Sequence, residues 1–357
     1  GFREKLWGIS ADGITYFANN LAASGTVSWT QVAKLRLPFG EVTKLLVAPG
    51  PNPSDDILYA ATNIGLFVYN NVGERWVATD LTLPYHQSNG TGTTVFRNAI
   101  YVNAGMSVYE YTPGEIGGRV RLMGPDLHDG LPADNQGIIT GMIGTHQELI
   151  VIIDGADTAT TDSDQLLMEA TDGIHTSMTI NTGLGYPTVL GWNTRGWEIK
   201  HQDSVGGTGV SKYMLVTNAY DSYRLWWATG TVVHYEFLPL GIENPNQVAT
   251  TRRESSGYWL MPWFDANAVH TEKTALVWHV DASSPSTAEK ITLKYAINYD
   301  DSDSALVTLG VVDRDGDFAF AMPNITYPTG VPFRSIRAKL ELERGPNLFR
   351  TPDVKKV

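Results

Sequence analysis

A pair of β-rich runs joined by a glycine-containing turn recurs along the first two thirds of the chain. It occurs at Leu6–Phe17, Ile57–Tyr69, Ala99–Tyr111, Tyr213–Phe237 and, as a looser copy, Glu148–Ile180. The copies lie roughly 40–65 residues apart, the length of a four-stranded propeller blade. Each pair carries apolar residues on both faces, which one hairpin cannot bury alone. The repeat therefore predicts a β-propeller over residues 1–245. It has about five blades, and more if the chain continues before Gly1.

The composition agrees with an all-β protein and excludes several classes of function. The 357 residues include 35 Gly, 16 Tyr and 10 Trp, which suits many short strands joined by tight turns. The net charge is −12, so we expect no nucleic-acid partner. The absence of cysteine excludes disulfides, zinc–thiolate sites and cysteine nucleophiles. No apolar run reaches the roughly 20 residues of a membrane span, so we expect no membrane insertion.

A second β-rich part follows a boundary near residues 239–256. Pro239–Asn246 is rich in turn residues, and Thr250–Gly257 is polar. The strands expected beyond it are Lys273–Val280, Glu289–Asn298, a hairpin of Ala305–Val312 with Phe318–Phe320, and Phe333–Glu343. Polar and apolar residues alternate over much of these runs, as in sheets with one solvent-facing side. They predict an antiparallel β-sandwich over residues 257–357.

Several segments resemble known families. Asp129–Gly141 and Thr62–Tyr69 resemble the blades of two-component-regulator-type propellers, and Ser10–Tyr16 is similar to a degenerate Asp-box. The order of Gly257–Asp265, Ile291–Tyr295 and Leu340–Gly345 resembles the C-terminal sandwich of tailed-phage virion proteins associated with the tail or baseplate. That resemblance implies a structural or host-surface-binding subunit in a virion, with other virion subunits and cell-surface glycan as partners. The alternatives are a glycosidase- or sialidase-like propeller enzyme and a bacterial extracellular scaffold or sensor domain.

No catalytic constellation is visible in the sequence. The eight histidines form no HxH or HxxxH pair, and no triad is recognisable. A sialidase needs clustered arginines to hold the substrate carboxylate, but basic residues are sparse in the first part. We therefore expect no enzymatic activity, no catalytic residue and no cofactor.

Exposed tryptophans are the best candidates for ligand or partner binding, because an indole ring stacks on apolar ring faces at little entropic cost. The candidates fall in or near expected loops and strand ends: Trp192, Trp197, Trp226, Trp227, Trp259 and Trp263. The alternative is that they fill blade interfaces or a domain joint. At least one of Trp226 and Trp227 should face a blade interface, since adjacent strand residues point to opposite faces.

Two further segments leave alternatives open. Asp313–Asp317 has acidic residues at alternate positions, which suits Ca²⁺, but the same residues also make an ordinary Asp-Gly turn. No metal site is therefore assigned. The tail Arg344–Val357 carries Leu348 and Phe349, so we expect it to contact the propeller or a neighbouring subunit. A tail that packs on its own sandwich is the alternative.

Overall fold

A computed structural model divides the chain into two compact units, Gly1–Gly241 and Ile242–Val357. The structure describes residues 5–10, 14–18, 28–31, 37, 39–52, 55–114, 117–126, 131, 135–155, 186–194, 196–203, 214–218, 223–238, 255–300, 302–347 and 351–357. In these ranges every long regular element is a strand, and η4 (Asp303–Ala305) is a short 3₁₀ helix. The all-β prediction is confirmed. No described helix is long and apolar enough to cross a membrane.

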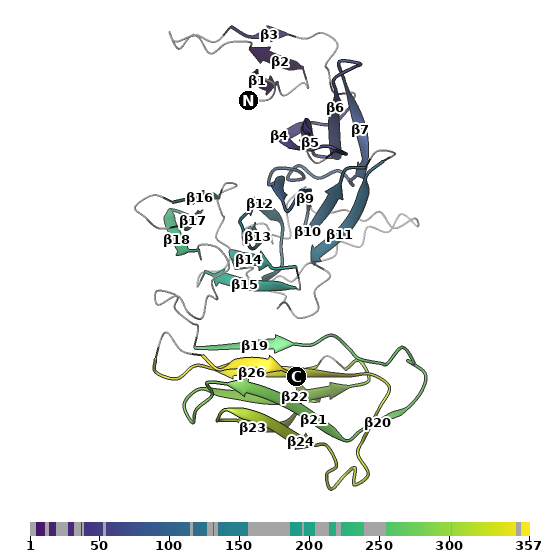
Figure 1. The fold of residues 1–357 in the computed structure, drawn as a ribbon, viewed down its shortest axis with the longest axis vertical. Coiled ribbons are helices and arrows are strands. Elements are labelled where there is room, and N and C mark those ends of the chain that lie inside the picture. The colour runs from purple at the N-terminus through teal and green to yellow at the C-terminus, as the bar shows by residue number, and fades with distance from the viewer. Residues whose placement is uncertain are drawn as a thin grey trace. The chain divides into compact units, whose positions relative to one another are not determined.

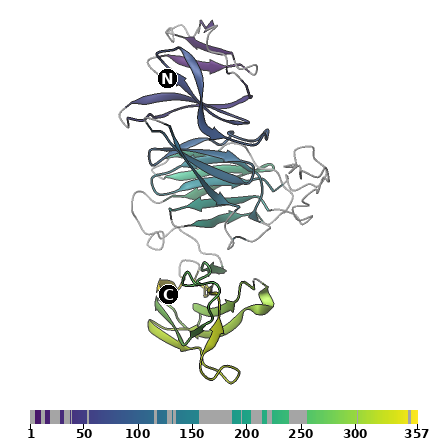
Figure 2. The same cartoon turned by 90° about the vertical axis from the view of Figure 1, so that its right-hand side faces the viewer.

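Among its described residues the first unit contains five antiparallel sheets, each a meander of strands in chain order (Figures 1 and 2). The first sheet is β1 (Leu6–Ile9), β2 (Thr15–Ala18) and β3 (Thr30–Gln31). The second is β4 (Val42–Pro49), β5 (Asp56–Thr62), β6 (Gly65–Asn70) and β7 (Arg75–Thr82). The third is β8 (Thr94–Phe96), β9 (Ala99–Ala104), β10 (Ser107–Thr112) and β11 (Arg119–Pro125). The fourth is β12 (Ile139–Gly144), β13 (Leu149–Ile153), β14 (Thr188–Trp192) and β15 (Trp197–Gln202). The fifth is β16 (Leu215–Thr217), β17 (Arg224–Thr229) and β18 (Val232–Phe237).

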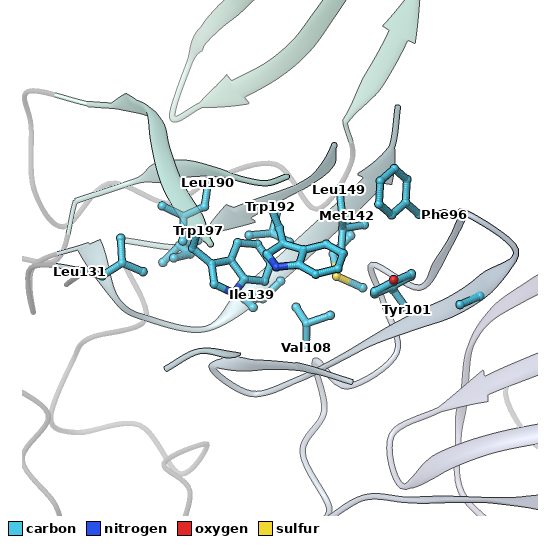
Figure 3. Packing of buried hydrophobic residues seen from close by; sticks show 13 residues of the cluster. Phe96, Tyr101, Val108, Leu131, Ile139, Met142, Leu149, Leu190, Trp192 and Trp197 are labelled. Carbon is cyan, nitrogen blue, oxygen red and sulfur yellow. The ribbon is translucent and has the colours of Figure 1, made fainter. Parts of the chain in front are cut away.

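Successive sheets of the first unit pack face to face, and the strand period of two explains how. On β13, Leu149, Val151 and Ile153 join a core cluster with the third sheet, while Ile150 and Ile152 join a cluster with the fifth. The same division of alternate residues occurs on β5 and β9, so the three inner sheets bury both faces. Figure 3 shows the cluster between the third and fourth sheets. These stacked meanders of three or four described strands are the blades of a propeller-type fold.

Buried asparagines tie the blades together. Asn63 and Asn103 each stand two residues before the turn glycine of their repeat. The Oδ1 of Asn63 accepts a hydrogen bond from the Glu41 amide, 3.0 Å, and that of Asn103 accepts one from Gly92, 2.9 Å. In both cases the donor precedes the first strand of the same blade. These two repeats therefore each use one asparagine to fix the chain as it enters the blade.

The second unit is a β-sandwich. Its larger sheet has the order β19 (Ser256–Leu260), β26 (Ile336–Glu343), β22 (Lys290–Ile297) and β23 (Val307–Val312). The smaller sheet has the order β24 (Gly316–Ala321), β21 (Val277–Ser283) and β27 (Asp353–Lys356). A short pair, β20 (Lys273–Ala275) with β25 (Val331–Phe333), completes the fold. Val280, Leu293 and Leu340, drawn from both sheets, belong to one buried core cluster.

The structure corrects two expectations about individual strands. Lys273–Val280 is not one strand, because β20 and β21 pair with different partners. Ala305–Val312 and Phe318–Phe320 do not form a hairpin: β23 pairs with β22 and β24 with β21, so the Asp315–Gly316 turn crosses between sheets. In the tail, Asp353–Lys356 is a strand that pairs with β21 of its own sandwich. Leu348, Phe349, residues 129–130 and 132–134 of the Asp129–Gly141 segment, and residues 156–180 of the Glu148–Ile180 repeat lie outside the described residues.

Candidate functional site

Trp192 and Trp197 lie inside the first unit. They face each other across β14 and β15 and are 8% and 7% exposed, within the cluster that joins the third and fourth sheets (Figure 3). The Trp197 Nε1 donates to the Met123 carbonyl at 2.9 Å. Their apolar rings are therefore used in packing between blades, the alternative that the sequence left open, and they offer no ring face to a ligand.

Trp226 and Trp227 point to opposite faces of β17, as adjacent strand residues must. Trp227 is 5% exposed and packs in the cluster between the fourth and fifth sheets, where its ring stacks on His234 with centroids 5.5 Å apart. Trp226 lies on the outer face, and its Nε1 donates to Thr217 Oγ1 at 3.0 Å. Only Trp226 of this pair therefore has its ring on an outward face.

The sandwich holds the remaining two candidates, Trp259 and Trp263. Trp259 lies on the edge strand β19 and is 49% exposed. Trp263 follows β19, and its ring lies against two other side chains. The Arg337 guanidinium carbon is 4.6 Å from the Trp263 ring centroid, and the Tyr299 ring centroid is 5.1 Å away. Trp263 thus lies in a mixed aromatic and charged group, as Trp226 does beside Tyr235 and Arg224.

The backbone around Trp263 is fixed to strand β26. The Met261 amide donates to the Ala338 carbonyl at 2.9 Å. Phe264 and Ile336 exchange two amide-to-carbonyl hydrogen bonds, 2.8 and 3.0 Å long. Because the segment continues the pairing of β19 with β26, Trp263 is held over Arg337. Arg337 is only 7% exposed, although it alternates outward from the core residues of β26.

A carboxylate and a phenol complete the group. Tyr299, which follows β22 and is 49% exposed, donates its hydroxyl to Asp265 Oδ2 at 3.2 Å. Asp265 Oδ1 accepts from the Asn267 amide at 2.8 Å. Loss of hydration, followed by the contact with Asp265, raises the pKa of Tyr299 above its ordinary value. We call Trp263, Asp265, Tyr299 and Arg337 the sandwich aromatic cluster.

The loops that carry this cluster have left-handed backbone at non-glycine residues. Asn267 has φ 56° and Tyr299 has φ 59°, and the preceding residue of each is also left-handed. Such conformations cost of order 1 kcal/mol each and persist where the surrounding structure fixes them. The hydrogen bonds of Asp265 to both loops supply that constraint. The rings of Trp263 and Tyr299 are therefore held in place before any ligand arrives.

The acidic loop Asp313–Asp317 does not gather its carboxylates. Asp315 Oδ1 accepts from the Ser284 amide, and Asp317 Oδ1 lies 3.6 Å from His279 Nδ1. Within the described ranges, no group of three histidine or acidic residues is arranged to hold a metal ion.

The sequence singles out only tryptophans as binding candidates. It gives no sign of Asp265, Tyr299 and Arg337. Asp265 closes the segment Gly257–Asp265, but nothing in the sequence links it to Tyr299, 34 residues away. Only the pairing of β22 with β26 brings Tyr299 and Arg337 to one place.

Comparisons with known proteins identify no family. No family model matches, and no curated protein matches. Among solved structures, a triple arginine-to-alanine variant of AofleA from Arthrobotrys oligospora is 14% identical, with a TM-score of 0.33. The match covers 66% of this chain and 64% of that one. The extracellular domain of the hybrid two component system BT4673 from B. thetaiotaomicron is 10% identical, with a TM-score of 0.32 over 94% of this chain and 55% of that one. This chain thus spans less than two thirds of each, and neither likeness carries an argument about function.

Proposed function

We propose that this chain is a non-enzymatic recognition module that binds neutral carbohydrate at the sandwich aromatic cluster, at the surface of a cell or particle. The observation that carries the proposal is the fixed Trp263–Tyr299 ring pair beside an oriented carboxylate. The C–H face of a sugar ring loses unfavourable hydration when it stacks on an indole or phenol ring. The Asp265 carboxylate accepts hydrogen bonds from sugar hydroxyls that approach the rings.

Preorganisation favours a small ligand here. Trp263 is packed against Arg337 and Tyr299, so stacking a sugar on it costs little rotamer entropy. Asp265 is held by one side-chain and one backbone donor and still has free acceptor capacity. A carboxylate next to the stacking face repels anionic sugars. The cluster therefore fits a neutral pyranose better than a uronic or sialic acid.

Calorimetric titration of neutral and carboxylated oligosaccharides tests this function. One small site of this kind is expected to bind with a Kd of about 0.1–1 mM, equivalent to about 4–5.5 kcal/mol. Trp263→Ala should abolish binding, because it removes the stacking ring. Trp259→Ala is the matched control, since Trp259 is an exposed ring of the same sandwich outside the cluster. Equal loss in both variants, or binding of carboxylated sugars only, contradicts the proposal.

The setting of this module is a separate part of the proposal. We propose a tailed-phage particle as the setting, because the sandwich segments resemble those of tail or baseplate proteins, and the alternative is an extracellular bacterial scaffold or sensor. Both settings need surface recognition, so the carbohydrate test does not separate them. Antibody labelling of purified particles does: labelling of the tail or baseplate supports the first setting, and labelling of bacterial envelopes supports the second.

The lack of catalysis is also testable. A retaining or inverting glycosidase needs two carboxyl groups about 5–9.5 Å apart. In the sandwich aromatic cluster Asp265 is the single carboxylate, and it is engaged by Tyr299. Incubation of bound oligosaccharides with the protein should therefore release no shorter product. Product formation that disappears in Asp265→Asn would show that the cluster is an enzyme active site instead.

A further inference from the structure

The first and fifth sheets of the first unit each have one packed face and one open face. On β1, Trp7 and Ile9 pack against the second sheet, so Leu6 and Gly8 point the other way. Trp29 covers Gly8: a side-chain carbon at Gly8 would lie 3.4 Å from its ring. Tyr16 pairs with Gly8 on the same face. We call Leu6, Tyr16 and Trp29 the first end face, on which Leu6 and Trp29 are exposed.

The fifth sheet has the corresponding arrangement. Leu225 and Trp227 of β17 pack inward, and Trp226 lies outward between its cross-strand partners Leu215 and Tyr235. The outward neighbours Val233 and Arg224 extend this surface. We call Leu215, Trp226, Val233 and Tyr235, with Arg224, the last end face. Val233 is 66% exposed, Leu215 58% and Tyr235 51%.

Arg224 organises the last end face. Its guanidinium carbon lies 4.9 Å from the Phe237 ring centroid and 5.0 Å from that of Tyr235. The arginine thereby holds the aromatic rings of β17 and β18 in one layer. Buried aromatics with arginine are the side chains that dominate stable protein interfaces. A free sheet face of this composition is costly to leave in water.

We propose that the last end face of one copy of this chain packs on the first end face of a second copy. The argument is continuity: each pair of neighbouring sheets within the first unit is joined by a face-to-face apolar cluster, and these two faces extend that series at both ends. Leu6 and Trp29 are exposed on the first end face, and Val233 and Tyr235 on the last.

The contact is head to tail, so it produces a ring or an open chain of copies. If the proposed carbohydrate site is correct, such an assembly also presents several weak sites together and raises the avidity for a surface. The assembly itself does not depend on that site, because the end faces and the sandwich aromatic cluster belong to different units of the chain.

Cysteine cross-linking tests the pairing, since the natural sequence contains no cysteine. Leu6→Cys marks the first end face and Val233→Cys marks the last. A short bismaleimide should join the two variants when they are mixed and should give no dimer with either variant alone. A dimer from one variant alone would mean that like faces meet. An internal cross-link within monomers of the double variant would mean that each chain closes on itself. Either result, or no cross-link in the mixture, overturns the proposal.

The mass in solution gives an independent test. Light scattering should show at least a doubled mass for the natural protein and a monomer for Tyr235→Asp at the same concentration. Val72→Asp is the matched control, because Val72 is a fully exposed apolar residue in the turn between β6 and β7. Thermal unfolding of both variants checks that they remain folded. A monomeric natural protein, or equal loss of assembly in both variants, overturns the proposal. Carbohydrate titration of monomeric Tyr235→Asp tests the carbohydrate site on its own.

Discussion

Replacement of Asn103 by alanine should destabilise the first unit more than any single change of an exposed residue. Asn103 is fully buried on β9. Its Nδ2 donates to the carbonyls of Ser88 and Ile139, both at 2.7 Å, and its Oδ1 accepts from the Gly92 amide at 2.9 Å. One side chain therefore joins the loop before the third sheet, that sheet itself and the first strand of the fourth sheet.

The cost follows from these three contacts. Each hydrogen bond contributes about 1 kcal/mol, and a buried amide without a partner costs about 1–3 kcal/mol more. Alanine at position 103 leaves the buried Gly92 amide without its side-chain acceptor. The Ser88 carbonyl still accepts a hydrogen bond from the Thr91 hydroxyl. The expected loss is therefore about 4–6 kcal/mol, a large part of the roughly 5–15 kcal/mol that stabilises most folded proteins.

Urea unfolding measures this loss. With a slope of about 3 kcal/mol per molar urea, the midpoint of the first-unit transition should fall by about 1.3–2 M at unchanged slope. Asn70→Ala is the matched control: the Asn70 Oδ1 also accepts two amide hydrogen bonds, from Val72 and Gly73, but in an exposed turn. Its loss should stay below about 1 kcal/mol. If both variants unfold at the same urea concentration, the interpretation of Asn103 as the link between blades is wrong.

Two further predictions concern the fourth and fifth sheets. Trp227→Ala should cost about 3–5 kcal/mol, and its neighbour Trp226→Ala clearly less, because only Trp227 is in the core; equal urea midpoints would refute the assigned faces. Burial, opposed by Lys200 and reinforced by Glu148 and Glu198, raises the pKa of Glu236 to about 7. The folded state thus keeps a proton that the unfolded chain releases near its ordinary pKa, so stability falls as pH rises from about 4.5 to 7. Relative to Glu236→Gln, the natural protein should lose about 2 kcal/mol between about pH 5 and pH 8, and parallel pH profiles would contradict this.

Much of the architecture could be predicted from the sequence, because strand periodicity and turn glycines are local signals. The run Leu149–Ile153 is apolar at every position and is buried on both faces of an inner blade. The repeated asparagine before the turn glycine was also visible, but its use as a chain anchor depends on contacts with residues that precede the blade. The path of β23 into β24 could not be predicted, since Asp-Gly turns occur both within sheets and between them.

The candidate site could be predicted only in part. All six tryptophans are apolar rings with one polar atom, and sequence alone does not determine which face of a strand is covered. Trp192 and Trp197 pack between sheets because both lie on the face of the fourth sheet that meets the third. Trp263 belongs to a surface cluster because Phe264 extends the pairing with β26. Arg337 alternates outward on its strand, and no local pattern indicates that Trp263 lies over it.

The carbohydrate proposal is tested most directly by nuclear magnetic resonance of the indole N–H groups. The Trp263 resonance is assigned by its disappearance in Trp263→Phe. During titration with a neutral oligosaccharide to about 10 mM, roughly ten times the weakest expected Kd, the Trp263 resonance should shift and saturate. The resonances of the buried Trp192 and Trp197 should not move. A stationary Trp263 resonance while another tryptophan shifts, or no shift for any neutral sugar, would contradict the account.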